Sequence, residues 1–191
     1  MKYLFITLVA ILLSGCIAKQ GVQSRYYELE NVAKPNFKCD RSANIDVFID
    51  KIKMLDIYQS RNIIYKQNSQ ISYLKDAKFA SYPNVMIYKS LIDYLQNHCK
   101  FKPVLSNKEC LLNLKITILD IYISQNEAKI SAFVSVNNDK KVLVNSVLSQ
   151  TKSIDKFSEE NAINALNLAL ANIQDQIYDL LTSALTTTSN N

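Results

Sequence analysis

The sequence predicts a single α/β domain in which a mixed, largely antiparallel sheet is covered by two main helices. Segments with an apolar residue at every second position alternate with two segments whose apolar residues recur every three or four positions. The order along the chain is strands, helix, strands, helix, with no internal repeat. We place this domain at residues 25–185, a length that suits one hydrophobic core.

Short strands joined by polar connections are expected first. The predicted strands are 25–29, 45–50, 62–66 and 70–74. In the second of them, Ile45, Val47 and Ile49 share one face, which we expect to be buried. Asn68 and Ser69 separate the last two strands, and their composition is typical of a tight turn.

The first helix is expected at 83–98. Pro83 suits the first turn of a helix, which does not need its missing N–H. An apolar stripe follows at Ile87, Leu91, Tyr94 and Leu95. Pro103 then prevents the helix from continuing.

Three strands with short connections come next, and they predict an antiparallel meander. They are 112–124, 128–136 and 142–150. Gln125-Asn126 and the polar residues 137–140 make the two turns.

The last helix begins after Ser158, a good N-cap residue, and Glu159 and Glu160 suit the positive end of the helix. Its apolar residues are Ile163, Leu166, Leu170, Ile173, Ile177 and Leu180. This stripe favours packing on the sheet, with a partner helix as the alternative. We expect residues 186–191 to be a disordered tail.

Several functions are disfavoured by composition. The formal charge is +5 without a dense basic run, so we expect no nucleic-acid partner. The only glycines are Gly15 and Gly21, too few for a phosphate-cradling loop. His98 is the only histidine, which removes two-histidine metal sites and most histidine-dependent triads, and we interpret it as structural or exposed. We therefore expect no cofactor, no metal and no enzymatic activity.

Three cysteines follow Cys16 in the chain: Cys39, Cys99 and Cys110. Cys99 and Cys110 flank a short connection and are the favoured disulfide pair. Pairing of Cys39 with either of them, or three unpaired thiols, are the alternatives.

The N-terminus resembles a bacterial lipoprotein signal. Lys2 precedes an apolar run over 3–13, which is too short for a comfortable membrane span. The sequence Leu13-Ser14-Gly15-Cys16 resembles a lipobox, in which the cysteine is lipidated and becomes the first residue. We therefore expect a signal peptide at 1–15, a lipid attachment (palmitate among the acyl chains) at Cys16 and a tether at 16–24. An ordinary secretory signal with a chance cysteine is the alternative.

Further motifs resemble the ABC-type transport auxiliary lipoproteins, the PqiC/YmbA-like family. The matching segments are Tyr26-Tyr27-Glu28-Leu29, Ile45-Asp46-Val47, Ile57-Tyr58 through Arg61 to Tyr65, and Phe79-Ala80-Ser81-Tyr82-Pro83. The sequence departs from the family pattern where Phe79 replaces a tryptophan, where an extra residue precedes Pro83, and where a proline is missing near Leu55.

The resemblance implies a three-layer α/β sandwich and a non-enzymatic docking role in the periplasm. The partners would be an MCE-domain (mammalian cell entry) substrate-binding protein and its ABC permease, in a system that moves phospholipid-like molecules. Ile17 favours anchoring in the inner leaflet of the outer membrane, and a homo-oligomer is compatible with this role. Residues 54–58, or the exposed face of the last helix, would contact the partner. The alternatives are a structural lipoprotein that assists assembly of an envelope secretion or export machine, and a lipid carrier with its own cavity.

Overall fold

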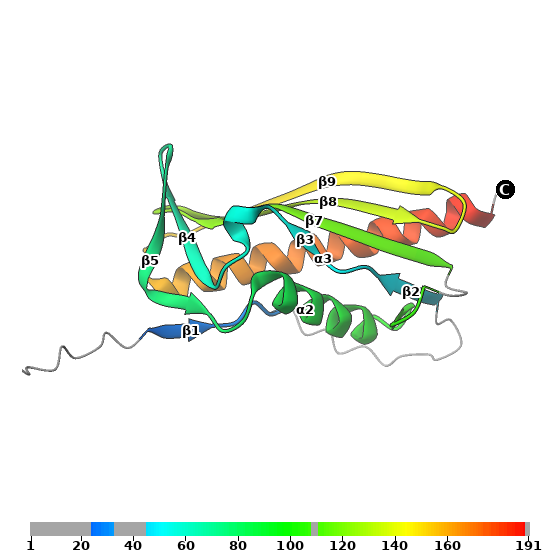
Figure 1. Cartoon of the computed structure of the whole chain (residues 1–191), viewed down its shortest axis with the longest axis horizontal. Helices are drawn as coiled ribbons and strands as arrows, with labels where there is room; N and C mark the ends of the chain where they lie inside the picture. Colours follow the sequence, from blue (N-terminus) through cyan, green and yellow to red (C-terminus); the bar gives the residue numbers. More distant parts are fainter. Residues whose placement is uncertain (1–23, 33–44, 108–110, 190–191) are drawn as a thin grey trace, which may run out of the picture.

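The computed structural model describes residues 24–32, 45–107 and 111–189. Its strands are β1 (Arg25–Tyr27), β2 (Ile45–Ile49), β3 (Lys53–Met54), β4 (Asn62–Gln67), β5 (Gln70–Phe79), β6 (Phe101–Val104), β7 (Leu112–Ile123), β8 (Glu127–Asn137) and β9 (Val142–Ser153). Its helices are the 3₁₀ turn η2 (Asp56–Tyr58), α2 (Pro83–Asn97) and α3 (Glu159–Ser189). Figure 1 shows an elongated molecule with α3 running along most of its length. The mixed α/β class with two main helices is confirmed.

The described strands form one sheet organised around β7. On one side of β7 lie β8 and then β9, in the antiparallel meander that the sequence predicts. On its other side β2, β3 and β4 pair with it in succession, all in parallel orientation. β6 extends the sheet beyond β2, and β5 with β1 extends it beyond β4.

The core lies on one face of this sheet, which we call the inner face. The register places Val47 beside Leu112 and Ile49 beside Leu114, and all four side chains are buried. In β8 every second residue from Ala128 to Val136 is fully buried on the same face. The predicted alternation of these strands is therefore confirmed.

Helix α3 covers the inner face and contacts β7, β8 and β9 (Figure 1). Its predicted N-cap is confirmed, because Ser158 Oγ accepts a hydrogen bond from the N–H of Asn161 at 3.1 Å. The apolar stripe packs on the sheet as expected, except that Leu181 replaces Leu180 as the fully buried residue. The helix runs to Ser189, so the expected disorder is wrong for residues 186–189.

Helix α2 packs on α3 and β6, with its predicted stripe of four apolar residues buried. Two contacts fasten the helices to each other: Tyr94 donates to Asp175 Oδ1 at 2.6 Å, and Gln174 donates to Ser90 Oγ at 2.9 Å.

Three features of the sheet differ from the prediction. β3 and β6 are additional short strands, and β5 extends to Phe79. β6 contains Pro103, which the sequence analysis treated only as a helix stop. Proline is tolerated there because β6 ends the sheet and pairs only with β2 among the described strands.

Candidate functional site

The predicted lipid attachment at Cys16 and the signal peptide at 1–15 lie outside the described residues, so both stay predictions. Within residues 24–32, 45–107 and 111–189, neither long helix is apolar enough over a sufficient length to cross a bilayer. The same ranges contain no group of three or more histidine, cysteine, aspartate or glutamate side chains arranged to hold a metal ion.

Cys99 lies directly after α2 in a left-handed backbone conformation, with φ of 63°, and it is disulfide-bonded. The other three cysteines lie outside the described residues, so pairing with Cys110 stays a prediction. His98 precedes it and has a packing role. Its ring lies 3.9 Å from the ring of Tyr94, and its Nδ1 lies 2.8 Å from the Tyr94 carbonyl oxygen.

The motif segments at 26–29, 57–65 and 79–83 meet where β1 joins the sheet. Tyr27 pairs with Phe79 in the parallel β1–β5 ladder. The Arg61 guanidinium lies 5.0 Å from the centre of the Tyr26 ring and donates to the Phe79 carbonyl at 3.0 Å. The N–H of Phe79 donates to the Arg61 carbonyl at 2.7 Å. We call this set of contacts the β1 junction.

The first residue of α3 strengthens the attachment of β1. Glu159 forms an ion pair with Arg25 at 2.6 Å and accepts a hydrogen bond from the Tyr27 hydroxyl at 3.2 Å. Burial raises the pKa of Tyr27; the Arg25 charge opposes this shift and the Glu159 carboxylate adds to it. The strand that follows the expected tether is therefore fixed to both the sheet and the last helix.

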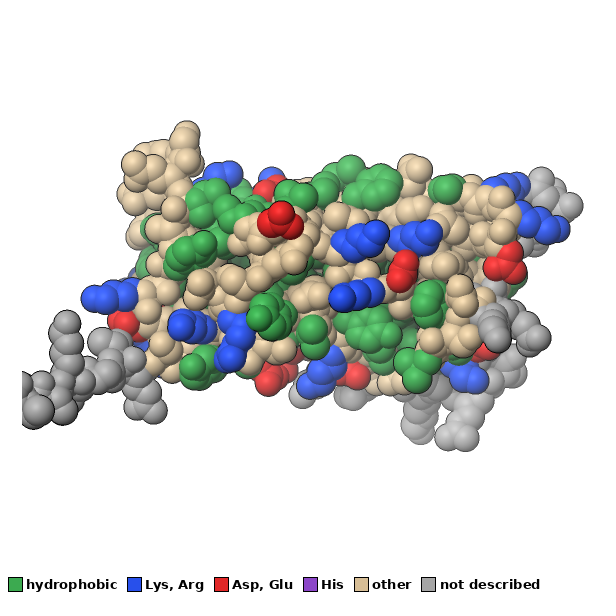
Figure 2. All heavy atoms as spheres, viewed as in Figure 1, with side chains coloured by type: hydrophobic (Ala, Val, Ile, Leu, Met, Phe, Trp, Pro, Cys, Tyr) green, Lys and Arg blue, Asp and Glu red, His purple; other side chains and the backbone are tan. Residues whose placement is uncertain are grey.

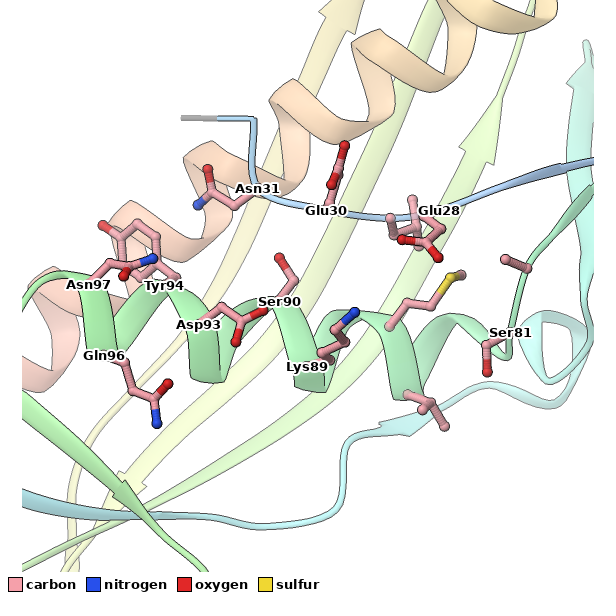
Figure 3. A pocket seen from close by; sticks show the side chains of 14 residues that line it. Glu28, Glu30, Asn31, Ser81, Lys89, Ser90, Asp93, Tyr94, Gln96 and Asn97 are labelled. Carbon is pink, nitrogen blue, oxygen red and sulfur yellow. The ribbon is translucent and has the colours of Figure 1, made fainter. Parts of the chain in front are cut away.

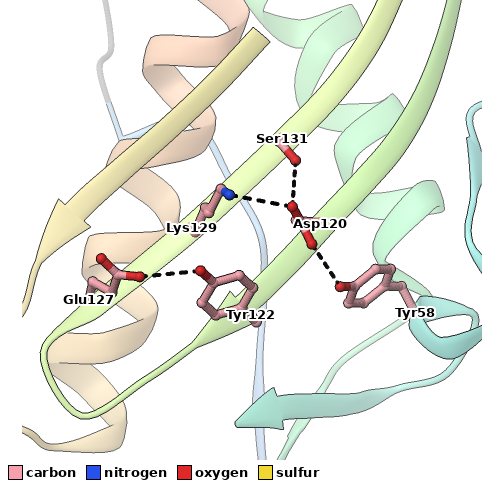
Figure 4. Close-up of polar contacts among 6 residues, drawn as sticks. All are labelled: Tyr58, Asp120, Tyr122, Glu127, Lys129 and Ser131. Atoms are coloured by element: carbon pink, nitrogen blue, oxygen red, sulfur yellow. Dashed lines mark hydrogen bonds and ion pairs between the residues drawn. The ribbon is translucent and has the colours of Figure 1, made fainter. Parts of the chain in front are cut away.

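A polar cluster lies on the outer face of the sheet, beside the turn that carries Tyr58 (Figure 4). Asp120 accepts hydrogen bonds from the Tyr58 hydroxyl at 3.1 Å and from Ser131 Oγ at 3.0 Å. Lys129 Nζ lies 3.4 Å from the same carboxylate. We call these four residues the Asp120 cluster.

A bulge in β7 makes this cluster possible. Strict alternation after Leu114, Ile116 and Ile118 would point Asp120 into the core. The register shift between Ile118 and Asp120 instead turns Asp120 outward and returns Ile121 to the core. Sequence reasoning did not identify Asp120, because a bulge leaves no mark in the apolar pattern.

The Asp120 cluster anchors the η2 segment to the sheet. Burial, followed by the Asp120 carboxylate, raises the pKa of Tyr58 to about 12. The hydroxyl therefore stays protonated at neutral pH and works as a hydrogen-bond donor. Through this hydrogen bond, Tyr58 holds η2 against Asp120 of β7.

The anchored segment presents apolar side chains to solvent. Of the residues 54–58 that the sequence analysis proposed as a contact surface, Met54 and Tyr58 are buried, whereas Leu55 is 49% and Ile57 40% exposed. Figure 2 shows hydrophobic side chains gathered over the region where Figure 1 places η2. We call Leu55 and Ile57 the η2 tip.

A groove of about 710 Å³ runs beside α2. Its lining includes Met86 and Tyr94, two residues of α2 whose side chains are otherwise buried. Figure 3 shows Glu28 and Glu30 on the segment after β1 and Lys89 on α2, around the same space. The lining mixes three carboxylates, including that of Asp93, with one ammonium group. Leu29, Val85 and Met86 also line the groove, so its wall is mixed polar and apolar.

Two buried amide side chains position the wall of this groove. Asn167 of α3 accepts from the N–H of Glu30 at 3.2 Å and donates to the Glu28 carbonyl at 3.4 Å. Gln174 accepts from the Asn31 side chain at 2.6 Å. Neither amide belongs to the apolar stripe from which the helix was predicted. The apolar pattern therefore gave no reason to expect Asn167 and Gln174 to be buried.

The family model of the ABC-type transport auxiliary lipoprotein component matches residues 27–178. The chain belongs to the ABC-type transport auxiliary lipoprotein family. The match begins in β1 and ends within α3, so it includes the Asp120 cluster, the η2 tip and all of the β1 junction except Tyr26. The resemblance inferred from the motifs is confirmed.

Solved structures share the fold of this auxiliary lipoprotein. The crystal structure of protein XCC0632 from Xanthomonas campestris has a TM-score of 0.70 and 12% identity, over 88% of this chain and 98% of that one. A crystal structure described as that of an uncharacterized protein also has a TM-score of 0.70 and 12% identity, over 83% and 99% of the two chains. The hypothetical protein CT253 from Chlamydia trachomatis has a TM-score of 0.54 and 9% identity, over 73% and 96%. No curated protein matches the sequence.

Proposed function

We propose that this auxiliary lipoprotein is anchored through lipidated Cys16, with its domain in the periplasm, and docks onto the other components of an ABC transport system for phospholipid-like molecules. The observation that carries the proposal is the family match over residues 27–178, which includes every strand except the first two residues of β1. An MCE-domain substrate-binding protein and its ABC permease are the proposed partners. Anchoring in the inner leaflet of the outer membrane is part of the same proposal.

The η2 tip is the proposed contact with the MCE-domain protein. Leu55 and Ile57 are exposed apolar side chains on a segment that Tyr58 holds to Asp120. A rigidly held apolar projection loses little conformational entropy on binding, which favours a docking role.

Crosslinking of native membranes, purification of the full-length chain and mass spectrometry would test the proposal. We expect an MCE-domain protein and an ABC permease to be recovered. The variant Leu55→Asp should reduce their recovery, whereas the matched variant Ile71→Asp, at an equally exposed site on the β4–β5 hairpin, should not. Recovery of a secretin or another envelope channel without an MCE-domain protein would contradict the proposal and favour a role in assembly of an export machine.

A further inference from the structure

The long edge strand β9 has an unpaired side. In the described part of the chain β9 pairs with β8 and with no other strand, and Figure 1 shows it at the margin of the sheet. Alternate backbone N–H and C=O groups along its 12 residues therefore point away from the sheet. Such an edge can accept a further strand.

The features that usually protect an edge strand are scarce in β9. Its sequence from Val142 to Ser153 contains no proline and one charged residue, Lys152. Its only register shift lies at its first residues, where Asn137 pairs with Val142. The central part is thus a regular, nearly uncharged strand, which is the kind of edge that proteins pair or cover.

Exposed apolar side chains lie on both sides of this edge. On the outer face Val147 is 62% exposed and lies in register with Phe133 of β8, which is 40% exposed. On the inner side the Asn172 side chain of α3 donates to Gln150 of β9 at 3.3 Å. Leu168, one turn before Asn172 on the same helix face, is 48% exposed. A strand added to β9 would cover these side chains from both sides.

We propose that β9 pairs antiparallel with β9 of a second copy of this chain, around a two-fold axis at Val147. Val147 lies near the middle of β9, so this axis brings the two Val147 side chains opposite each other. The register then extends the apolar row to Phe133 of both copies. Because β9 carries one charge near its end, self-pairing opposes no like charges at its centre. The interface is isologous and therefore closes at two copies.

Photo-crosslinking and charge pairing test this dimer in the full-length, detergent-solubilised chain. A photoreactive residue at position 147 should give an adduct of two chains, and one at the equally exposed position Ile71 should give none. Val147→Lys and Val147→Glu should each weaken dimerisation about tenfold or more, because like charges then face each other across the axis. A mixture of the two variants should recover the dimer as a mixed species.

Each result decides the proposal. Only a two-fold contact predicts recovery in the mixture, so a mixed sample that stays monomeric overturns it. Adducts at position 147 with a different protein, or no adduct at all, also overturn it. Sedimentation of both single variants as dimers would do the same. Circular dichroism of each variant verifies folding. The crosslinking experiment uses the chain without either charged substitution, so its result does not depend on the charges.

Discussion

Tyr58 and Asp120 together decide whether the η2 tip is a rigid projection or a mobile loop. Tyr58 is buried, and its hydroxyl donates to a carboxylate that a bulge has turned outward. Lys129 and Ser131 satisfy the remaining oxygen of that carboxylate. At this scale a single hydroxyl links residues that are far apart in the sequence.

Removal of that hydroxyl should destabilise the domain. We expect Tyr58→Phe to lower the free energy of unfolding by about 1–2 kcal/mol, because the Asp120 carboxylate loses a hydrogen-bond donor. Urea unfolding followed by circular dichroism measures the change. Tyr73→Phe, on an exposed side chain of β5, is the matched control and should have an effect near zero. Equal effects of the two variants would show that the Tyr58 contact adds no stability.

The raised pKa of Tyr58 predicts an alkaline loss of stability. An unfolded tyrosine titrates near pH 10, whereas the pKa of Tyr58 in the folded chain is about 12. The folded state therefore binds more protons between these values, and its stability should fall as the pH rises from about 10 to about 12. The unfolding midpoint measured across this interval should fall less steeply in Tyr58→Phe. Identical slopes in the two proteins would contradict the prediction.

At the scale of elements, the β1 junction connects the expected tether to the folded domain. Arg61 contacts Tyr26 through its guanidinium and Phe79 through a hydrogen bond, so one side chain bridges β1 and β5. The N–H of Ala80 donates to the Tyr27 carbonyl at 2.7 Å, which gives a backbone probe of the same attachment.

Arg61→Ala should loosen β1 without unfolding the domain. We expect hydrogen exchange of the Ala80 amide to accelerate by about three- to tenfold, because the cation–π contact and one hydrogen bond are lost. Lys75→Ala, at an exposed position of β5, should leave that rate unchanged. An unchanged Ala80 rate in Arg61→Ala would mean that Arg61 does not hold β1.

The sequence predicted the elements that have a strong apolar period and missed those that depend on distant pairing. The alternation at Val47 and Ile49 and the stripe of α3 followed from single-face burial. β6 was missed because Pro103 argues against a strand unless the strand lies at an edge, and only the fold shows that it does. Of the candidate site, the segment 54–58 was predicted, but Asp120 was not, because its partner Tyr58 is 62 residues away.

The whole molecule combines a proposed lipid anchor, a firmly attached first strand and an apolar projection on the outer face. The anchor stays a prediction, because Cys16 lies outside the described residues. If Cys16 is lipidated, Cys16→Ala should move the protein from the membrane pellet to the soluble fraction of an envelope preparation, because the acyl chains hold it there. Ser14→Ala, a small-for-small change in the same motif, should leave it in the pellet. Membrane retention of Cys16→Ala would refute the lipid anchor.

The central claim is that the η2 tip docks onto the transporter, and a photoreactive residue at position 55 in living cells tests it most directly. The account predicts an adduct with the MCE-domain protein, and its loss when Tyr58→Phe releases η2 from Asp120. An adduct with an unrelated envelope protein at position 55, in cells where the MCE-domain protein is present, would contradict it.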